Sequence, residues 1–275
     1  MLFTMGMIFS EFEASAWDAV RELDPGAAER LTYGSHDDQF IECWRPGSIN
    51  APAPVVVLIH GGCWSEEYDI SHIRPMATAL ANEGYAVWAP EYRRLGQAGG
   101  GWPGTFEDIG QAVDLLAKLD DPDMDSRRVV IAGHSAGGHL ALWASGRSRL
   151  RPGQALYTPD PFVPKSVIGL AAITDLQKHM CENNGCASEA LQLMGGNAAE
   201  RPERYEQASP ARLGSDVPVF LLHGDSDAIV SADQATAMRG AETVILEGAG
   251  HFDMIHPGAA AFAALLTVLK RVMKS

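Results

Sequence analysis

A short apolar run at residues 128–132 is followed directly by the sequence GHSAG at 133–137 and then by a helical pattern at 136–147. The apolar run is rich in β-branched residues, as in strands that are buried on both faces of a sheet. Small residues on both sides of Ser135 permit a turn that is too tight for bulky neighbours. The segment therefore predicts a strand, a sharp turn and a helix, with Ser135 raised above the carboxyl end of the strand.

Strand-like and helix-like segments alternate along most of the chain. Alternating apolar and polar residues predict a half-buried strand at 38–45. Apolar runs predict strands at residues 55–59, 85–89, 128–132, 166–172, 217–222 and 243–246. Helical patterns lie at residues 12–22, 71–83, 105–119, 136–147, 231–239 and 258–273. This order predicts an α/β fold, in which a mostly parallel central sheet carries helices on both faces. Ligands of such sheets bind beyond the carboxyl ends of the strands.

Two stretches interrupt the alternation. Residues 93–104 are rich in glycine and predict a loop over the edge of the sheet, but no Lys-Ser/Thr pair follows to hold a phosphate. Residues 175–213 are polar and broken by Gly and Pro, and a connection of this length is usually a lid or cap. We expect one domain over residues 1–275 with a small cap at about 175–213.

The charge of the chain limits its partners. Acidic residues outnumber basic ones, 35 against 21, which gives a net charge of −14. Such a field repels nucleic acid and anionic membranes, so a small-molecule substrate is expected and neither of those partners is. No apolar stretch is long enough to span a bilayer.

The location of the protein is less constrained. Residues 1–10 lack Lys and Arg and contain only a short apolar run, so they predict a flexible start or a misassigned start codon. The sequence leaves open whether the protein is made as a longer precursor. We expect a cytoplasmic protein, with a periplasmic or secreted location and a homodimer left open.

Ser135 is the candidate nucleophile. A helix N-terminus supplies free amides and a dipole that favour a developing oxyanion. A serine hydroxyl also needs a base. In folds of this kind, an acid and then a histidine follow the serine along the chain. His251, in a glycine-rich turn after the last predicted strand, is preferred to His256 at the start of the last helix. His134 and His139 flank the turn and are expected to pack rather than react.

The acid that orients the histidine should follow an earlier strand. The sequence HGDSDAIV offers Asp225 and Asp227. Asp227 is preferred because the later position can point back toward His251, whereas Asp225 is expected to bond its own turn. Asp175, after the preceding strand, is a third candidate.

The loop HGGCW after the run at 55–59 is expected to complete an oxyanion hole. Its glycines let the backbone approach a substrate oxygen, so the amides of Gly62 or Cys63 would act together with that of Ala136. Trp64 and Trp102 are candidate substrate-binding residues, and a core position for Trp64 is the alternative.

The four cysteines are too sparse for a disulfide scaffold. Cys181 and Cys186 lie close together and predict either two thiols or a local disulfide. With His179 they suggest a metal site, but no fourth ligand is evident, so no metal is expected. Cys63 is expected to be a buried, inert thiol.

The motifs HGGCW, GHSAGGHLA, HGDSDAIV and GAGH, in this order, resemble the α/β-hydrolase superfamily over roughly residues 50–272. The HGG-x-W form is similar to the kynurenine formamidase branch and its bacterial carboxylesterase relatives. The resemblance implies an α/β-hydrolase fold and hydrolysis through an acyl-enzyme, without a metal or organic cofactor. It supports Ser135, Asp227 and His251 as a catalytic triad.

Four functions are consistent with these residues. The first is a carboxylesterase for small acyl esters, and the second is an arylformamidase in which Trp64 and Trp102 would stack on the aryl group. A peptidase of the prolyl oligopeptidase type would usually carry a propeller domain, and a non-catalytic binding module would usually lack a triad member. No sequence motif separates the ester from the formamide.

Overall fold

The computed structural model describes residues 11–26, 28–47, 52–118, 121–182 and 185–274, so the N-terminal segment at 1–10 lies outside the described residues. Its centre is a sheet in the order β1-β2-β4-β3-β5-β6-β7-β8. Pairing is antiparallel between β1 and β2 and between β2 and β4, and parallel elsewhere. The strands are β1 (Glu29–Thr32), β2 (Phe40–Trp44), β3 (Ala53–Ile59), β4 (Ala86–Pro90), β5 (Met124–His134), β6 (Ser166–Leu170), β7 (Val219–Gly224) and β8 (Glu242–Leu246).

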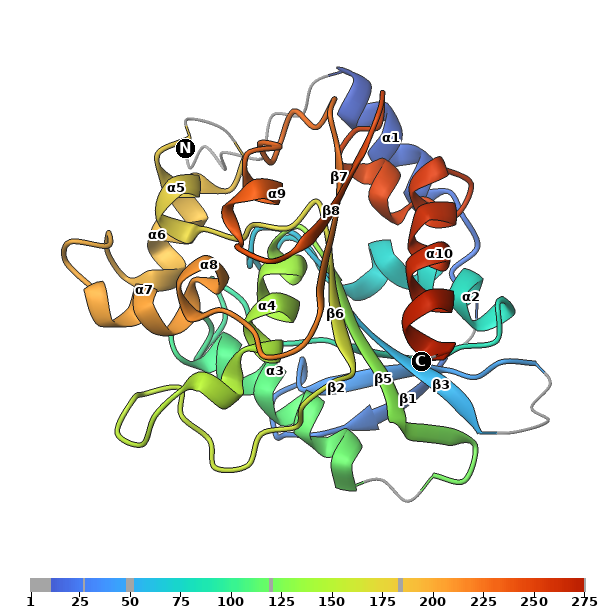
Figure 1. Cartoon of the computed structure of the whole chain (residues 1–275), viewed down its shortest axis with the longest axis horizontal. Coiled ribbons are helices and arrows are strands. Elements are labelled where there is room, and N and C mark those ends of the chain that lie inside the picture. Colours follow the sequence, from blue (N-terminus) through green and yellow to red (C-terminus); the bar gives the residue numbers. More distant parts are fainter. Residues whose placement is uncertain (1–10, 27, 48–51, 119–120, 183–184, 275) are drawn as a thin grey trace.

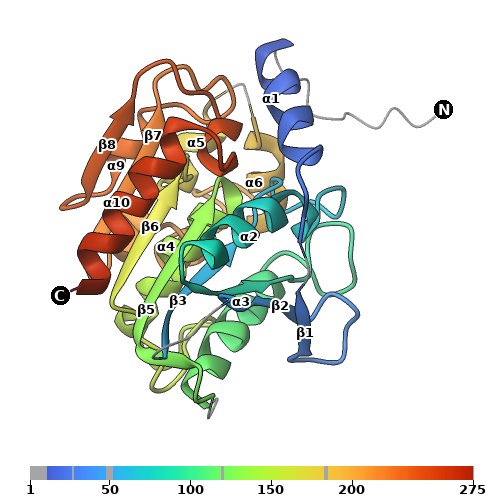
Figure 2. The ribbon, with the colours of Figure 1, turned by 90° about the vertical axis from the view of Figure 1, so that its right-hand side faces the viewer.

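Helices cover both faces of the sheet. α2 (Arg74–Asn82) and α10 (Ala260–Lys274) lie on one face, and α3 (Gly104–Leu115) and α4 (Ala136–Ser145) lie on the other (Figure 1). α1 (Glu11–Arg21) lies at one end of the sheet (Figure 2), where it packs against two short 3₁₀ helices, η1 (Ile70–Ile73) and η4 (Phe252–Ile255). The remaining short elements are η2 (Leu116–Lys118), η3 (Arg147–Arg149) and α9 (Gln234–Ala237). Within the described ranges no helix combines the length and apolarity needed to cross a bilayer.

The predicted layers are confirmed, with two differences in the elements. β1 was not predicted, because its sequence ERLT is polar and all four residues are exposed at the sheet edge. The helix expected at 231–239 is shorter and spans only α9. An exposed polar strand and a one-turn helix both lack the apolar periodicity on which the prediction depends.

The connection between β6 and β7 folds into four short helices. They are α5 (Leu176–Met180), α6 (Ala187–Met194), α7 (Pro202–Ala208) and α8 (Pro210–Leu213). We call residues 175–213 the α5–α8 segment. The glycine-rich loop at 93–104 is held near it, since the Trp102 amide donates to the Leu193 carbonyl at 3.0 Å.

Backbone-to-backbone packing fixes the start of α4. A Cβ on Gly137 would lie 2.2 Å from the His60 carbonyl oxygen and 2.3 Å from that of Ile59, at the end of β3. A Cβ on Gly133 would lie 2.2 Å from the Gly137 carbonyl oxygen. Only glycine fits at these two positions, and this is why the turn around Ser135 needs small residues.

We therefore expect Gly137→Ala to lower the free energy of unfolding by about 1–3 kcal/mol, because the added methyl group meets backbone that cannot rotate away. Urea unfolding measures the change. Gly47→Ala is the control, since a Cβ there meets nothing within 4 Å. Equal stability of the two variants would contradict this packing argument.

Candidate active site

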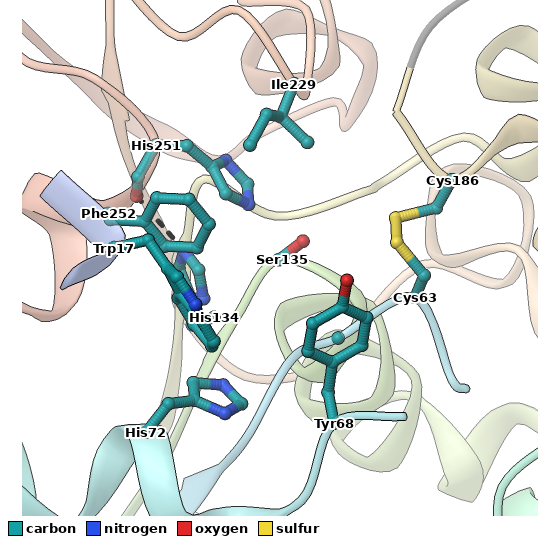
Figure 3. A pocket seen from close by; sticks show the side chains of 11 residues that line it. Trp17, Cys63, Tyr68, His72, His134, Ser135, Cys186, Ile229, His251 and Phe252 are labelled. Carbon is teal, nitrogen blue, oxygen red and sulfur yellow. Dashed lines mark hydrogen bonds between the residues drawn. A yellow bond between two sulfur atoms is a disulfide. The ribbon is translucent and has the colours of Figure 1, made fainter. Parts of the chain in front are cut away.

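Ser135 lies at the sharp bend between β5 and α4. Its backbone has φ 57° and ψ −121°, and its amide donates to the Leu170 carbonyl on the neighbouring strand at 2.9 Å. A non-glycine residue in such a conformation costs on the order of 1–3 kcal/mol and persists only where its surroundings enforce it. The strained turn directs the Ser135 hydroxyl out of the sheet and into a pocket (Figure 3).

His251 and Asp227 form a buried pair beside that pocket. The His251 Nδ1 lies 2.7 Å from the Asp227 Oδ2, and the two side chains are 3% and 0% exposed. The amides of Ile229 and Val230 donate to the other oxygen, Oδ1, at 2.9 and 2.8 Å. With Nδ1–H donated to the carboxylate, the Nε2 of His251 is left to act as an acceptor toward the pocket.

The charge state of Asp227 follows from these contacts. Burial by itself raises the pKa of this carboxyl, but the His251 charge, the His251 hydrogen bond and the Val230 amide lower it further, so the pKa lies below its usual value. Asp227 is therefore an anion at neutral pH. An anionic partner stabilises the imidazolium that forms when His251 accepts a proton.

The alternative residues have other contacts. The carboxylate of Asp225 accepts from the Gly248 amide at 2.7 Å and from the Ser226 hydroxyl at 3.1 Å, so it joins its own turn to the loop before His251. Asp175 caps α5 through the amides of Gln177 and Lys178. His256 accepts from the Gly258 amide.

The loop after β3 lies directly against Ser135. A Cβ on Gly61 would be 3.1 Å from the Ser135 Cβ, and the next three residues, Gly62, Cys63 and Trp64, have φ values of 99°, 53° and 56°. We call residues 60–64 the oxyanion loop. The Ala136 amide lies in the first turn of α4, where amides have no acceptor within their own helix. Gly62 and Cys63 line the same pocket as Ser135, and Ala136 directly follows Ser135 at the start of α4.

A buried polar network supports the oxyanion loop from below. The Nε2 of His60 lies 2.8 Å from the Glu91 Oε1, and the Tyr92 hydroxyl donates to the His60 carbonyl at 2.9 Å. Glu91 also accepts from the Ile70 amide and pairs with Arg94. These contacts fix the first residue of the loop, and no sequence motif indicated them.

The pocket above Ser135 has a volume of about 310 Å³, counted to its open mouth. Its lining combines the predicted site residues with side chains that the sequence did not indicate (Figure 3). The latter are Trp17, Tyr68, His72, Cys186, Ile229 and Phe252. Trp17 comes from α1 and packs against Phe252, His72 and Tyr68, with ring centroids 4.9, 5.1 and 5.9 Å away.

The two predicted substrate-binding tryptophans do not line this pocket, which corrects that prediction. Trp64 is fully buried and meets the His139 ring edge-on, as the core alternative expected. Trp102 lines a different depression, where the Arg204 guanidinium lies 5.4 Å from the centre of its ring. Trp64 packs inside the domain, and Trp102 contacts Arg204 of the α5–α8 segment.

The cysteine predictions are also wrong in part. Cys63 is not a free thiol but forms a disulfide with Cys186, and Cys181 is exposed and unbonded. The local Cys181–Cys186 pair is therefore not formed. His179 contacts Glu182 instead of a metal-ligand set, and no cluster of three or more metal-ligating side chains occurs among the described residues.

Comparison with known proteins agrees with this fold. Residues 41–241, more than half of the chain, match the family model described as BD-FAE. The chain belongs to the BD-FAE family. Esterase LipC of Mycobacterium tuberculosis is 26% identical over 265 residues, which cover 88% of this chain and 65% of LipC. The probable carboxylic ester hydrolase LipM of the same organism is 28% identical and covers 74% of this chain and 49% of LipM.

Solved structures show the same fold. Esterase B of Lactobacillus rhamnosis superposes with a TM-score of 0.78 at 20% identity, covering 96% of this chain and 92% of that one. The predicted α/β-hydrolase fold is confirmed. The finer resemblance to the kynurenine formamidase branch stays a prediction. This chain spans about half to two thirds of the length of LipM and LipC.

Three buried histidines of this BD-FAE family member, His72, His134 and His139, have pKa values far below the usual one. Burial, aided by the charge of His60, lowers the pKa of His72 to about 3, and burial lowers that of His139 to about 3. Burial and the charge of His251 hold the pKa of His134 well below its usual value. Each ring is therefore neutral in the folded protein, as expected of packing residues.

These rings should make the protein acid-sensitive. In the unfolded chain a histidine takes up a proton below about pH 6.5, whereas the folded rings do not, so stability is full above that pH and falls as acid is added. Each ring contributes a slope of about 1.4 kcal/mol per pH unit. Urea unfolding between about pH 6.5 and 5 measures the slope.

His139→Gln should reduce this slope by about one proton, because glutamine does not titrate. The amide of glutamine retains a donor for the Ala208 carbonyl, which the His139 Nε2 approaches to 3.0 Å. An unchanged slope in this variant would show that His139 is not neutral in the folded state.

Proposed function

We propose that this protein is a carboxylesterase that cleaves small esters through an acyl-enzyme. The observation that carries the proposal is the joint placement of Ser135 and the Asp227-bonded His251 in one pocket. LipC and LipM are named as esterases, which supports the same reaction class. We extend to this chain the triad roles and the oxyanion roles of Gly62, Cys63 and Ala136.

The geometry favours the following sequence of steps. The His251 Nε2 accepts the hydroxyl proton of Ser135, whose oxygen attacks the ester carbonyl carbon. Amides of the oxyanion loop and of Ala136 donate to the oxygen as it becomes negative. His251 then protonates the departing alcohol, and water repeats the attack to release the acid. Asp227 stays anionic and keeps Nδ1–H in place throughout.

The pocket supports a short and largely apolar substrate. Its space of about 310 Å³ includes the open mouth, so the part enclosed by side chains is smaller still. Aromatic side chains from α1, η4 and the segment before η1 close its sides. An arylformamidase with the same residues is the second candidate, since the Trp17 and Phe252 rings offer an aryl group a surface.

Ser135→Ala should abolish labelling by a fluorophosphonate probe, because the probe bonds covalently to the activated serine oxygen. Asp227→Asn should lower kcat by about 10³–10⁴-fold, because it removes the anion and permits the wrong imidazole tautomer. Asp225→Asn is the matched control and keeps an oxygen for the Gly248 amide. Labelling of Ser135→Ala at the wild-type rate would overturn the catalytic assignment.

A substrate panel tests the class of substrate. We expect p-nitrophenyl acetate and butyrate to be hydrolysed with a higher kcat/KM than N-formylkynurenine, and the reverse order would favour the formamidase. Trp17→Ala should extend tolerance to longer chains in either the acyl or the alcohol series, since each buried methylene is worth about 0.8 kcal/mol. Trp102→Ala is the control, because Trp102 lies outside the pocket. An unchanged length profile in both series would exclude Trp17 as a pocket wall.

A further inference from the structure

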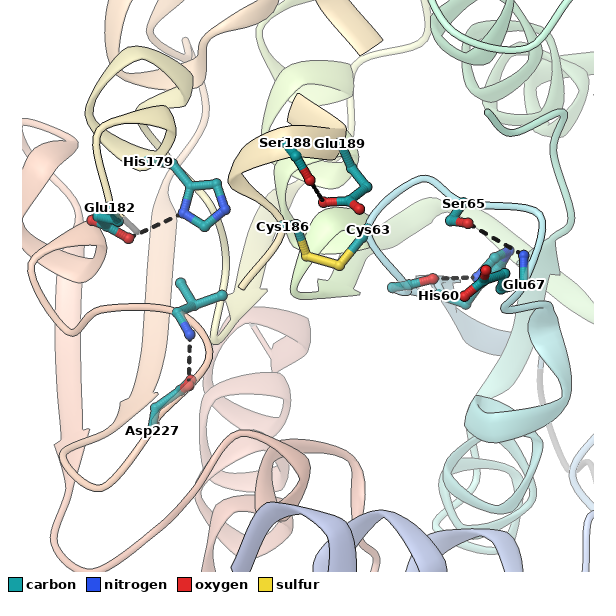
Figure 4. The surroundings of a disulfide bond; sticks show 12 residues. His60, Cys63, Ser65, Glu67, His179, Glu182, Cys186, Ser188, Glu189 and Asp227 are labelled. Carbon is teal, nitrogen blue, oxygen red and sulfur yellow. Dashed lines mark hydrogen bonds and ion pairs between the residues drawn. A yellow bond between two sulfur atoms is a disulfide. The ribbon is translucent and has the colours of Figure 1, made fainter. Parts of the chain in front are cut away.

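The disulfide between Cys63 and Cys186 crosses the wall of the pocket. The two Cα atoms are 5.2 Å apart in space but separated by 123 residues along the chain. Cys63 belongs to the oxyanion loop, and Cys186 is the N-cap residue of α6 in the α5–α8 segment (Figure 4). Both cysteines line the pocket that contains Ser135.

The oxyanion loop is anchored on both sides of Cys63. On the Trp64 side, the Trp64 carbonyl accepts from the Leu95 amide at 2.7 Å, and the indole is fully buried. The second anchor is the disulfide, which joins the Cys63 side chain to Cys186 at the start of α6. Since Cys63 and Trp64 both have the left-handed backbone that non-glycine residues disfavour, their conformation depends on such anchors.

The start of α6 is itself packed against the turn that carries Asp227. A Cβ on Gly185 would lie 2.3 Å from the Ile229 carbonyl oxygen, and the Ile229 amide donates to the Asp227 Oδ1. The disulfide therefore connects the oxyanion loop to a segment that rests on the acid turn. It links the two sides of the pocket between which Ser135 lies.

We propose that the Cys63–Cys186 disulfide is a positioning element that holds the Cys63 amide where it can stabilise the oxyanion, and that the enzyme is fully active only in its oxidised form. The proposal rests on the proposed esterase function. Without the bond, the first helical turn of α6 no longer restrains Cys63, and the left-handed loop loses its covalent anchor. The expected loss is in kcat, because an oxyanion donor acts in the transition state.

Reduction requires a dithiol that enters through the pocket. The two cysteines are 3% and 0% exposed, so the bond is shielded from solvent, and the pocket that both residues line is the side from which a dithiol can approach it. One thiolate of the dithiol attacks a sulfur of the disulfide and displaces the other cysteine as a thiolate, which takes up a proton. The second thiol then displaces the remaining cysteine, so two electrons and two protons reach the protein and the dithiol becomes a cyclic disulfide.

The proposal also bears on location. Disulfides persist in oxidising compartments and are rare in the reducing cytoplasm. A working enzyme with this bond therefore fits a periplasmic or secreted location better than the cytoplasmic one expected from the sequence.

Dithiothreitol treatment of the wild-type protein is the direct test, with p-nitrophenyl acetate as substrate. Thiol titration after denaturation should rise from two groups to four, since Cys43 and Cys181 are free before reduction. We expect kcat to fall by about ten-fold or more, with KM changed by less than about three-fold, and to recover on reoxidation with oxidised glutathione. A purely structural bond would instead lower the melting temperature and leave kcat unchanged below it.

Cys186→Ala should show the low kcat from the start and should not respond to dithiothreitol. Cys181→Ala is the matched control in the same segment and should behave as the wild type. Two outcomes overturn the proposal: four titratable thiols in protein purified without reductant, or a reduced enzyme that keeps its full kcat. Fluorophosphonate labelling of Ser135 separates the two proposals, because its absence in the oxidised enzyme would contradict the esterase function itself.

Discussion

The close approach of two backbones, at Gly137 of α4 and at the end of β3, is the contact on which the rest of the site depends. No side chain stands between the helix and the His60 carbonyl. The distance from Ser135 to the oxyanion loop is therefore set by peptide geometry rather than by rotamers, which fluctuate more. A nucleophile and its oxyanion donors need this constancy, because misplacement by a fraction of a bond length weakens transition-state hydrogen bonds.

Two buried ionic networks support the two parts of the site, the oxyanion loop and the base His251. Glu91, with His60 and Arg94, lies beneath the oxyanion loop, and Asp227 lies beneath His251. In both, a carboxylate removed from water is compensated by backbone amides as well as by a charged or polar side chain. Carboxylates whose two oxygens are both hydrogen-bonded are held rigidly, whereas an unpaired one would be costly to bury. The base and the oxyanion loop are thus held by similar means from opposite sides of Ser135.

The parts of the molecule that the sequence predicted are those encoded by neighbouring residues. The turn around Ser135, the order of acid and histidine, and the alternation of buried strands all have local patterns. The Cys63–Cys186 bond and the position of Trp17 have none, because each brings together segments that are distant along the chain. The pairing of Cys186 with the nearby Cys181 was the plausible local choice, and the fold carries the partner elsewhere.

Errors about burial have a related cause. Trp64 was placed at the site because it ends the motif HGGCW, and Trp102 because the glycine-rich loop at 93–104 was expected to lie over the edge of the sheet. Side-chain direction, however, depends on the backbone conformation at each position. The positive φ at Trp64 turns its indole into the core. Sequence proximity to a motif is thus a weaker guide to pocket lining than to catalytic role.

The origin of the pocket wall has a consequence for how such a protein diverges. Trp17 belongs to α1, which contributes no strand to the sheet and meets the domain chiefly at η1 and η4. Exchange of this one helix would reshape the space available to a substrate and leave the turn at Ser135, the turn that carries Asp227 and the oxyanion loop untouched. Selection can therefore change substrate preference through substitutions in α1, while the residues of the reaction centre stay the same.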